Sequence, residues 1–146
     1  MNEFKTAKDN KNKIIISLGD PAGIGTEITL KALGSNYLNK NIKPLLVGCK
    51  NNIYTTYLKL IKHGINNIPN PKNLDIFDIP LNKKVVPGVV DEYTGSASFE
   101  WLVNATNLLL DGKSKALVTA PISKIAWHKA GHEFAGQTEL LGKLTN

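Results

Sequence analysis

The sequence is poor in cysteine and has no arginine, and both absences narrow what the protein can do. One cysteine, Cys49, among 146 residues excludes an internal disulfide and a cysteine-based zinc cluster, and we interpret it as a buried thiol. All 18 basic residues are lysines, so the guanidinium fork that reads guanine or grips a phosphodiester is missing. The lysines are scattered along the chain, which indicates a solvated surface of formal net charge +6 and disfavours nucleic-acid binding.

Long apolar runs are also missing. No segment reaches the roughly eighteen continuous apolar residues of a membrane span, and residues 1–13 are polar and lysine-rich, unlike a secretion signal. We therefore expect residues 1–12 to form a flexible leader, and we expect a cytoplasmic protein without a membrane partner. A composition of 42% hydrophobic and 21% charged residues is typical of soluble proteins that bury a core.

Predicted strands and helices alternate along the chain. Short apolar runs predict strands at residues 13–18, 43–48 and 116–120, and alternating apolar and polar residues predict a strand at 74–79. Helical periodicity predicts helices over 27–33 and 52–63, from 94 or 96 to 110, from Pro121 onward, and from Leu140 onward, with residues 80–93 irregular. Because parallel strands need crossovers of about a dozen residues or more, this alternation predicts an α/β fold with a mainly parallel sheet and helices on both faces.

The first candidate motif is the glycine-rich segment GDPAGIGTE, residues 19–27, between a predicted strand and a predicted helix. Glycines let the backbone turn tightly and approach a ligand, and the helix start that follows presents N–H groups to an anion. The segment lacks the third glycine of the dinucleotide fingerprint and the lysine of a P-loop. A turn that merely lets strand and helix pack stays open as the alternative.

The second motif is LVTAPISK, residues 117–124, at the carboxyl end of a predicted strand, where open α/β sheets bind their ligands. Thr119, Ser123 and Lys124 would place two hydroxyls and a cation near a helix N-terminus. That combination suits a phosphate or a carboxylate. A plain solvated Lys124 is the alternative, and this motif alone does not decide between them.

The third motif is AGHEFAGQTELL, residues 130–141. Gly136 permits an unusual backbone angle, and Gln137 and Thr138 offer neutral hydrogen-bond donors and acceptors. The two leucines that follow are expected to start a helix that anchors this loop on the core. The segment is therefore a candidate for binding a polar ligand.

Histidines are few, and their positions disfavour a metal site. His128 and His132 have the four-residue spacing of a helical zinc pair, but Gly131 is expected to end the helix between them. No glutamate stands between them as in metalloproteases, so we predict surface or hydrogen-bonding histidines. His63 is expected at a helix C-terminus, where it favours the helix dipole.

The order and spacing of these three motifs resemble those of the 4-hydroxythreonine-4-phosphate dehydrogenase family of vitamin B6 (pyridoxine and pyridoxal phosphate) biosynthesis. The resemblance covers residues 13–146, but less than half of a full-length member. It implies the N-terminal portion of a two-lobed α/β dehydrogenase, similar to isocitrate and isopropylmalate dehydrogenases, with a homodimer and a site in the cleft between the lobes.

The resemblance also implies the chemistry and the site residues. The intact enzyme would oxidise a phosphorylated small-molecule substrate with NAD or NADP and then release carbon dioxide to give 3-amino-2-oxopropyl phosphate, aided by a divalent metal held by three histidines. The family's substrate-binding His-Thr pair maps onto Gln137 and Thr138. Gln137 departs from the family histidine, and glutamine can donate a hydrogen bond but cannot shuttle a proton. Asp20 and Lys124 match motif positions near the cleft and are predicted polar contributors.

The resemblance places all three metal histidines, and most dinucleotide contacts, beyond the segment that ends at Asn146. We therefore expect no metal site, no catalytic residue and no bound cofactor in this chain, and an inactive fragment; which residues would contact the cofactor stays unknown. Two further explanations stay open. One is a non-catalytic phosphate-binding α/β module, and the other is an assembly subunit that needs a partner chain with the histidines.

Overall fold

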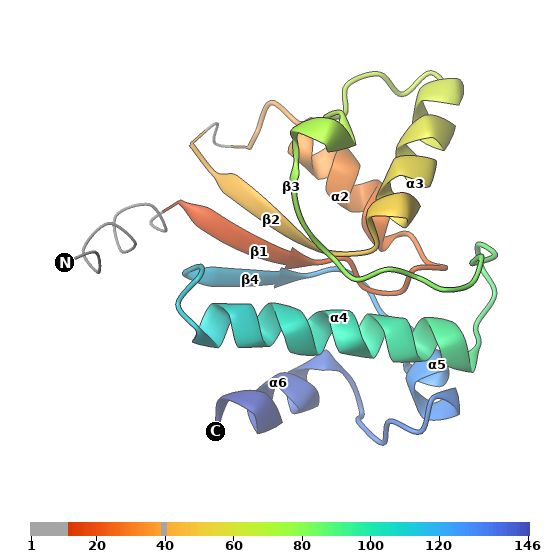
Figure 1. Ribbon diagram of the computed structural model, residues 1–146, viewed down its shortest axis with the longest axis vertical. Coiled ribbons are helices and arrows are strands. Elements are labelled where there is room, and N and C mark those ends of the chain that lie inside the picture. The colour runs from red at the N-terminus through yellow and green to blue at the C-terminus, as the bar shows by residue number, and fades with distance from the viewer. Residues whose placement is uncertain (1–11, 39–40) are drawn as a thin grey trace.

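The computed structural model describes residues 12–38 and 41–146 (Figure 1). The leader expected at residues 1–12 therefore lies, except for its last residue, outside the described part of the chain. Among the described residues, no helix combines the length and the apolar character that a membrane span needs.

Four parallel strands form one sheet in the order β3-β2-β1-β4. Their bounds are β1 Lys13–Ser17, β2 Lys43–Gly48, β3 Asp75–Asp78 and β4 Ala116–Thr119. Each lies within the run that predicted it, shortened by up to one residue at either end. The central strand β1 pairs Ile15 with Leu45 of β2 and with Leu117 of β4. The predicted parallel α/β sheet is confirmed.

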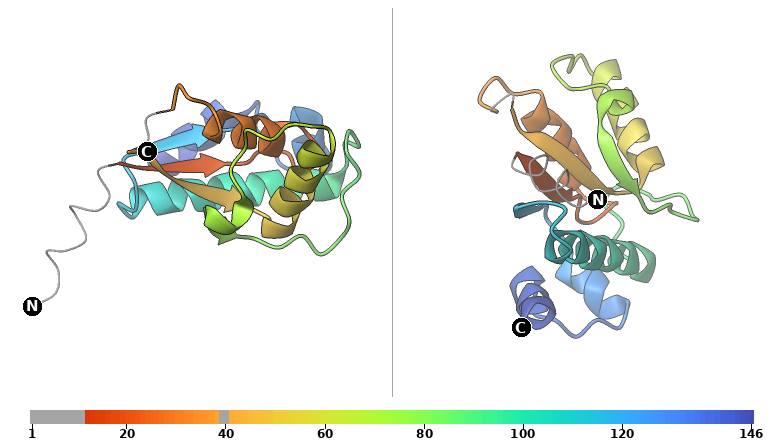
Figure 2. Two further views of the ribbon diagram at one scale, coloured as in Figure 1. Left: turned by 90° about the horizontal axis from the view of Figure 1, so that it is seen from above. Right: turned by 60° about the vertical axis from the view of Figure 1, so that its left-hand side comes forward.

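Helices cover both faces of this sheet, as predicted (Figures 1 and 2). Helices α2 Gly25–Leu33 and α3 Lys50–Lys62 lie on one face, and α4 Glu92–Leu110 lies on the other. Right-handed crossovers explain why α2 and α3 lie on one face and α4 on the other. The chain moves across the sheet in one direction from β1 through β2 to β3, and it moves in the opposite direction from β3 to β4. A third layer, α5 Lys124–Lys129 and α6 Gln137–Thr145, packs against α4, and a short 3₁₀ turn, η1, spans Pro71–Asn73.

Two clusters of buried apolar side chains hold these layers together. The larger cluster joins the sheet to its covering helices, with Ile15, Leu46 and Trp101 fully buried. The smaller one joins Leu102 of α4, Trp127 of α5 and Leu140 of α6. At this second interface the indole nitrogen of Trp127 donates a hydrogen bond of 2.8 Å to Ser98 Oγ, so the buried polar group is satisfied.

The helix starts differ from the sequence predictions, and side-chain capping explains two of the differences. The long helix α4 begins at Glu92, before the predicted 94 or 96, because Asp91 and Thr94 form a reciprocal capping box. The prediction that Pro121 opens a helix is wrong: α5 begins at Lys124, where Ser123 Oγ accepts from the Ala126 N–H at 3.2 Å. Three other helices, α2, α3 and α6, begin two to three residues before their predicted starts.

Candidate functional site

The strand order places two of the three motifs at the point where the chain reverses direction across the sheet. Strand β1 has β2 on one edge and β4 on the other, and the glycine-rich loop and the 120–123 segment follow β1 and β4. Open α/β sheets bind ligands outside the carboxyl ends of their strands at such a switch point. The two loops touch directly, because the Asp20 N–H donates to the Pro121 carbonyl at 3.0 Å.

The glycines of the first motif serve this contact. Gly19 has φ +71°, and a Cβ built there would stand 2.1 Å from the Pro121 carbonyl oxygen. A Cβ on Gly25 would stand 2.1 Å from the Leu18 carbonyl oxygen and 3.0 Å from the Ala120 Cβ. Both positions need glycine because a neighbouring carbonyl oxygen lies where a Cβ would be. These two glycines therefore fit a turn that lets strand and helix pack, which was the alternative to a ligand-binding loop.

Asp20 lies inside this loop. Its side chain is 6% exposed, and Oδ1 accepts a 2.8 Å hydrogen bond from the Ala22 N–H. Burial raises the pKa of Asp20; the hydrogen bond from Ala22 lowers it, and the charge of Asp91 raises it further. Asp20 therefore shapes the turn beside the site, and it does not line the cavity described next.

A cavity of about 610 Å³ brings the other three predicted site residues together. Lys124, Gln137 and Thr138 all line it, along with Pro121, Ile122, Ala135, Gly136 and Glu139. The Gln137 amide nitrogen donates a 2.8 Å hydrogen bond to the Ala120 carbonyl, which ties the start of α6 to the end of β4. The second and third motifs therefore form one wall, and the first motif contacts it through the hydrogen bond from the Asp20 N–H to the Pro121 carbonyl.

Two features of this wall differ from the sequence predictions. Gly136 has φ 163°, which is extended backbone open to any residue, so the prediction of an unusual angle is wrong. Its missing side chain matters instead because Lys124 passes there: a Cβ would stand 3.3 Å from Lys124 Cε. Glu139, which the sequence analysis did not single out, accepts a hydrogen bond from the Ala135 N–H, and a glutamate in the first turn of a helix is the signal that could have found it.

The hydroxyls of the second motif do not join Lys124. Ser123 Oγ caps α5, and Thr119 lines a separate apolar cavity beside α2. The charged and polar side chains of the wall are those of Lys124, Glu139, Gln137 and Thr138. Glu139 already accepts from the Ala135 N–H, and the Lys124 cation with the two neutral hydrogen-bonding groups suits a small anion that also carries hydroxyls.

The histidines lie apart from this wall. Gly131, with φ +81°, ends α5 between His128 and His132, as predicted. The ring of His132 stacks on Phe99 with a centroid distance of 3.6 Å, and burial lowers the pKa of His132. His63 lies at the C-terminal cap of α3, with Nδ1 2.7 Å from the Lys59 carbonyl. Within residues 12–38 and 41–146, no group of three or more His, Cys, Asp or Glu side chains could hold a metal ion.

A reversing parallel sheet with a polar cavity beyond the carboxyl end of its strands is typical of α/β enzymes that act on small molecules. The family described as "Pyridoxal phosphate biosynthetic protein PdxA" matches residues 40–146. The chain belongs to this family.

Relatives of known sequence are dehydrogenases. A 4-hydroxythreonine-4-phosphate dehydrogenase from Synechococcus sp. (strain RCC307) is 46% identical over 90% of this chain and 39% of that protein. A D-threonate 4-phosphate dehydrogenase from Pectobacterium atrosepticum is 37% identical over 91% of this chain and 44% of that protein. The chain therefore spans about two-fifths of the length of these relatives.

A solved structure shows the same fold. The 4-hydroxythreonine-4-phosphate dehydrogenase from Klebsiella pneumoniae superposes with a TM-score of 0.77 at 34% identity, over 92% of this chain and 44% of that chain. The predicted resemblance to this dehydrogenase family and the α/β fold class are thus confirmed for a chain that matches less than half of its relatives.

Proposed function

We propose that this chain supplies the amino-terminal part of a dehydrogenase whose substrate is a phosphorylated hydroxy acid, namely 4-hydroxythreonine 4-phosphate. The observation that carries the proposal is the single wall made by Lys124, Gln137 and Thr138. Lys124 supplies the cation that an anionic phosphate or carboxylate group requires, and the two neutral side chains offer hydrogen bonds to hydroxyl or phosphate oxygens. The names of the relatives support a phosphorylated substrate.

D-threonate 4-phosphate is the second candidate substrate, because one relative is named for it. The two molecules share the phosphate, the carboxylate and the hydroxyl next to the phosphate-bearing carbon, and they differ beside the carboxylate, where one has an amino group and the other a hydroxyl. Gln137 carries no charge that would select for or against an ammonium group. Titrating both ligands into the same protein compares them directly.

In the intact enzyme we propose oxidation of the substrate hydroxyl by NAD or NADP, then loss of carbon dioxide to give 3-amino-2-oxopropyl phosphate, in a cytoplasmic homodimer. The nicotinamide cofactor would accept the hydride. Gln137 is already hydrogen-bonded to Ala120 and cannot shuttle a proton, so its role here is to orient the substrate. We further propose that the isolated chain gives no turnover, and NADH formation from 4-hydroxythreonine 4-phosphate would overturn that.

Calorimetry tests the binding role of the wall. We expect saturable binding of 4-hydroxythreonine 4-phosphate that weakens about fivefold or more in Lys124→Gln and in Thr138→Val, because each removes one hydrogen-bonding or charged partner. Lys115→Gln is the matched control, since it removes one exposed lysine next to the amino end of β4, away from the cavity. Binding of inorganic phosphate with indifference to the organic substrate would favour a generic phosphate-binding module, and binding of neither would remove the proposal.

A further inference from the structure

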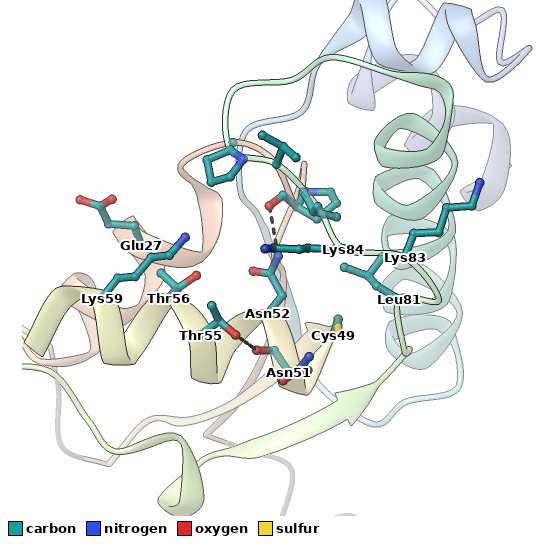
Figure 3. Close-up of a pocket in the computed structure, with 15 residues that line it drawn as sticks. Glu27, Cys49, Asn51, Asn52, Thr55, Thr56, Lys59, Leu81, Lys83 and Lys84 are labelled. Atoms are coloured by element: carbon teal, nitrogen blue, oxygen red, sulfur yellow. Dashed lines mark hydrogen bonds between the residues drawn. The ribbon is translucent and has the colours of Figure 1, made fainter. Parts of the chain in front are cut away.

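A second, larger cavity lies beside the glycine-rich loop, and none of the predicted site residues lines it. It has a volume of about 900 Å³, and its walls come from the glycine-rich motif, from α3 as far as Lys59 and from residues 81–87 (Figure 3). That volume is within the range of about 300–1,000 Å³ in which small-molecule sites fall.

Positive charge dominates the lining of this cavity. Lys59 of α3 and Lys83 and Lys84 of the 81–87 segment line it, against one carboxylate, Glu27. Glu27 is already paired with Lys31 at 2.5 Å, so its charge is largely offset. Within the described part of the chain, neither Lys59 nor Lys84 has an ion-pair partner. An excess of uncompensated cations around a hollow attracts anions.

The lysines differ in where they point. Lys84 is directed from the 81–87 segment towards α3, and Lys59 is directed to the side of α3 that carries Thr56 (Figure 3). Lys83 is directed away, and its ammonium lies 5.5 Å from the centre of the Tyr93 ring. Lys59 and Lys84 are therefore the two cations, from two different elements, that can reach one bound group.

The rest of the lining supplies hydrogen bonds and a fixed frame. Asn52 joins two walls, because its Nδ2 donates to the Pro21 carbonyl at 3.1 Å and its Oδ1 accepts from Thr26 Oγ1 at 3.4 Å. Helix α3 begins at this cavity with Cys49 as N-cap residue, and its first N–H, that of Lys50, already donates to Asp78 Oδ1 at 2.8 Å, so the cations of this cavity are the lysine side chains. The hydroxyl of Thr56 lines the cavity as well.

We propose that this cavity binds the diphosphate group of an anionic small molecule, held between Lys59 and Lys84. A group with two or more negative charges matches two lysines from two different segments, whereas a neutral ligand would leave both ammonium groups without a counter-charge. The site goes beyond the proposed function and does not depend on it, since it shares no lining residue with the Lys124 cavity.

Calorimetric titration of the full chain with inorganic pyrophosphate tests the proposal. We expect saturable binding that weakens with added salt, and about fivefold or more in each of Lys59→Gln and Lys84→Gln. Lys115→Gln controls for net charge, and thermal melting confirms that each exposed-lysine variant stays folded. Absence of saturable binding, or equal loss in all three variants, would overturn the proposal.

Two competition arms identify the source of the diphosphate. Displacement of pyrophosphate by NAD assigns the group to a dinucleotide, and displacement by ADP but not by NAD assigns it to a free nucleotide; either result supports the site. Lys124→Gln is expected to leave pyrophosphate affinity unchanged, while Lys59→Gln is expected to leave affinity for 4-hydroxythreonine 4-phosphate unchanged. The failure of one site is therefore distinguishable from the failure of the other.

Discussion

At the scale of single residues, burial decides the ionisation of Asp20. Its pKa lies above the ordinary 3.8, so the folded protein binds a proton more readily there than the unfolded chain does. The contribution of Asp20 to the free energy of unfolding is therefore greatest at pH values below 3.8. It decreases as the pH rises from 3.8 through the raised pKa, and it stays lower at neutral pH.

Asp20→Asn tests this account. The asparagine oxygen can still accept from the Ala22 N–H, and the variant avoids the buried charge, so we expect it to be at least as stable as the parent at neutral pH. The advantage is expected to shrink as the pH falls towards 3.8. Thermal melting of both proteins across this pH range checks the prediction. An increase in the stability of the parent relative to the variant as the pH rises would contradict it.

The pKa of His132 is shifted in the opposite sense. It lies below the ordinary 6.5 because the ring, stacked on Phe99, is partly withdrawn from water. The unfolded chain binds the proton more readily, so stability decreases as the pH falls through 6.5 towards the lowered value. The ring of Trp127 packs edge-on against Phe99 with a centroid distance of 5.3 Å. We expect the packing around Trp127 to become less tight over this pH range.

Tryptophan fluorescence between neutral and mildly acidic pH measures this loosening. His132→Gln is expected to abolish the pH dependence, and His128→Gln, which changes an exposed histidine on α5, is expected to retain it. An unchanged transition in His132→Gln would assign the effect to another group.

At the scale of the elements, α4 and α5 approach so closely that one glycine is required between them. A Cβ on Gly95 would stand 2.0 Å from the Ala126 carbonyl oxygen, which is backbone and cannot rotate away. Gly142 in α6 has nothing within 4 Å of such a Cβ. Both glycines lie inside helices, so alanine changes helix propensity in the same way at each position, and a difference between the two variants reports the packing.

The same substitution should therefore have opposite signs at the two positions. Gly95→Ala is expected to destabilise by about 1–3 kcal/mol because α5 must move. Gly142→Ala is expected to stabilise by about 0.5–1 kcal/mol, because alanine loses less backbone entropy in a helix. Urea unfolding of each variant gives the free energies of unfolding, and a destabilising Gly142→Ala or a neutral Gly95→Ala would refute the packing at that position.

The strands were predictable from sequence because three of them lie in short apolar runs, as in Lys43–Gly48, and the fourth, Asp75–Asp78, lies in an alternating segment. Helix starts were less predictable because one hydrogen bond decides them. Proline tolerates the first turn of a helix, which led to the prediction at Pro121, but the Ser123 hydroxyl places the start three residues later. The Pro121 carbonyl instead accepts from the glycine-rich loop, a long-range contact that no local pattern reveals.

At the scale of the whole molecule, the site was predictable in part. Three of the four expected substrate residues line one cavity, because Lys124 follows the end of β4 and the hydrogen bond from Gln137 to Ala120 brings the start of α6 back to that end. Asp20 stands apart, because the sequence cannot tell whether a loop carboxylate faces a ligand or its own backbone. The lysine-lined cavity also escaped prediction, since it depends on where the irregular 81–87 segment lies against α3.

The central claim is that the second and third motifs build one wall of a substrate site, supported by the first. Titration of 4-hydroxythreonine 4-phosphate into isotopically labelled protein, followed by amide chemical shifts, tests it most directly. The account predicts saturable shifts at Lys124, Gln137 and Thr138 with a common affinity, and little change at Lys113 and Lys115 near the amino end of β4. Shifts that never saturate, or that saturate only at residues outside this wall, would contradict the account.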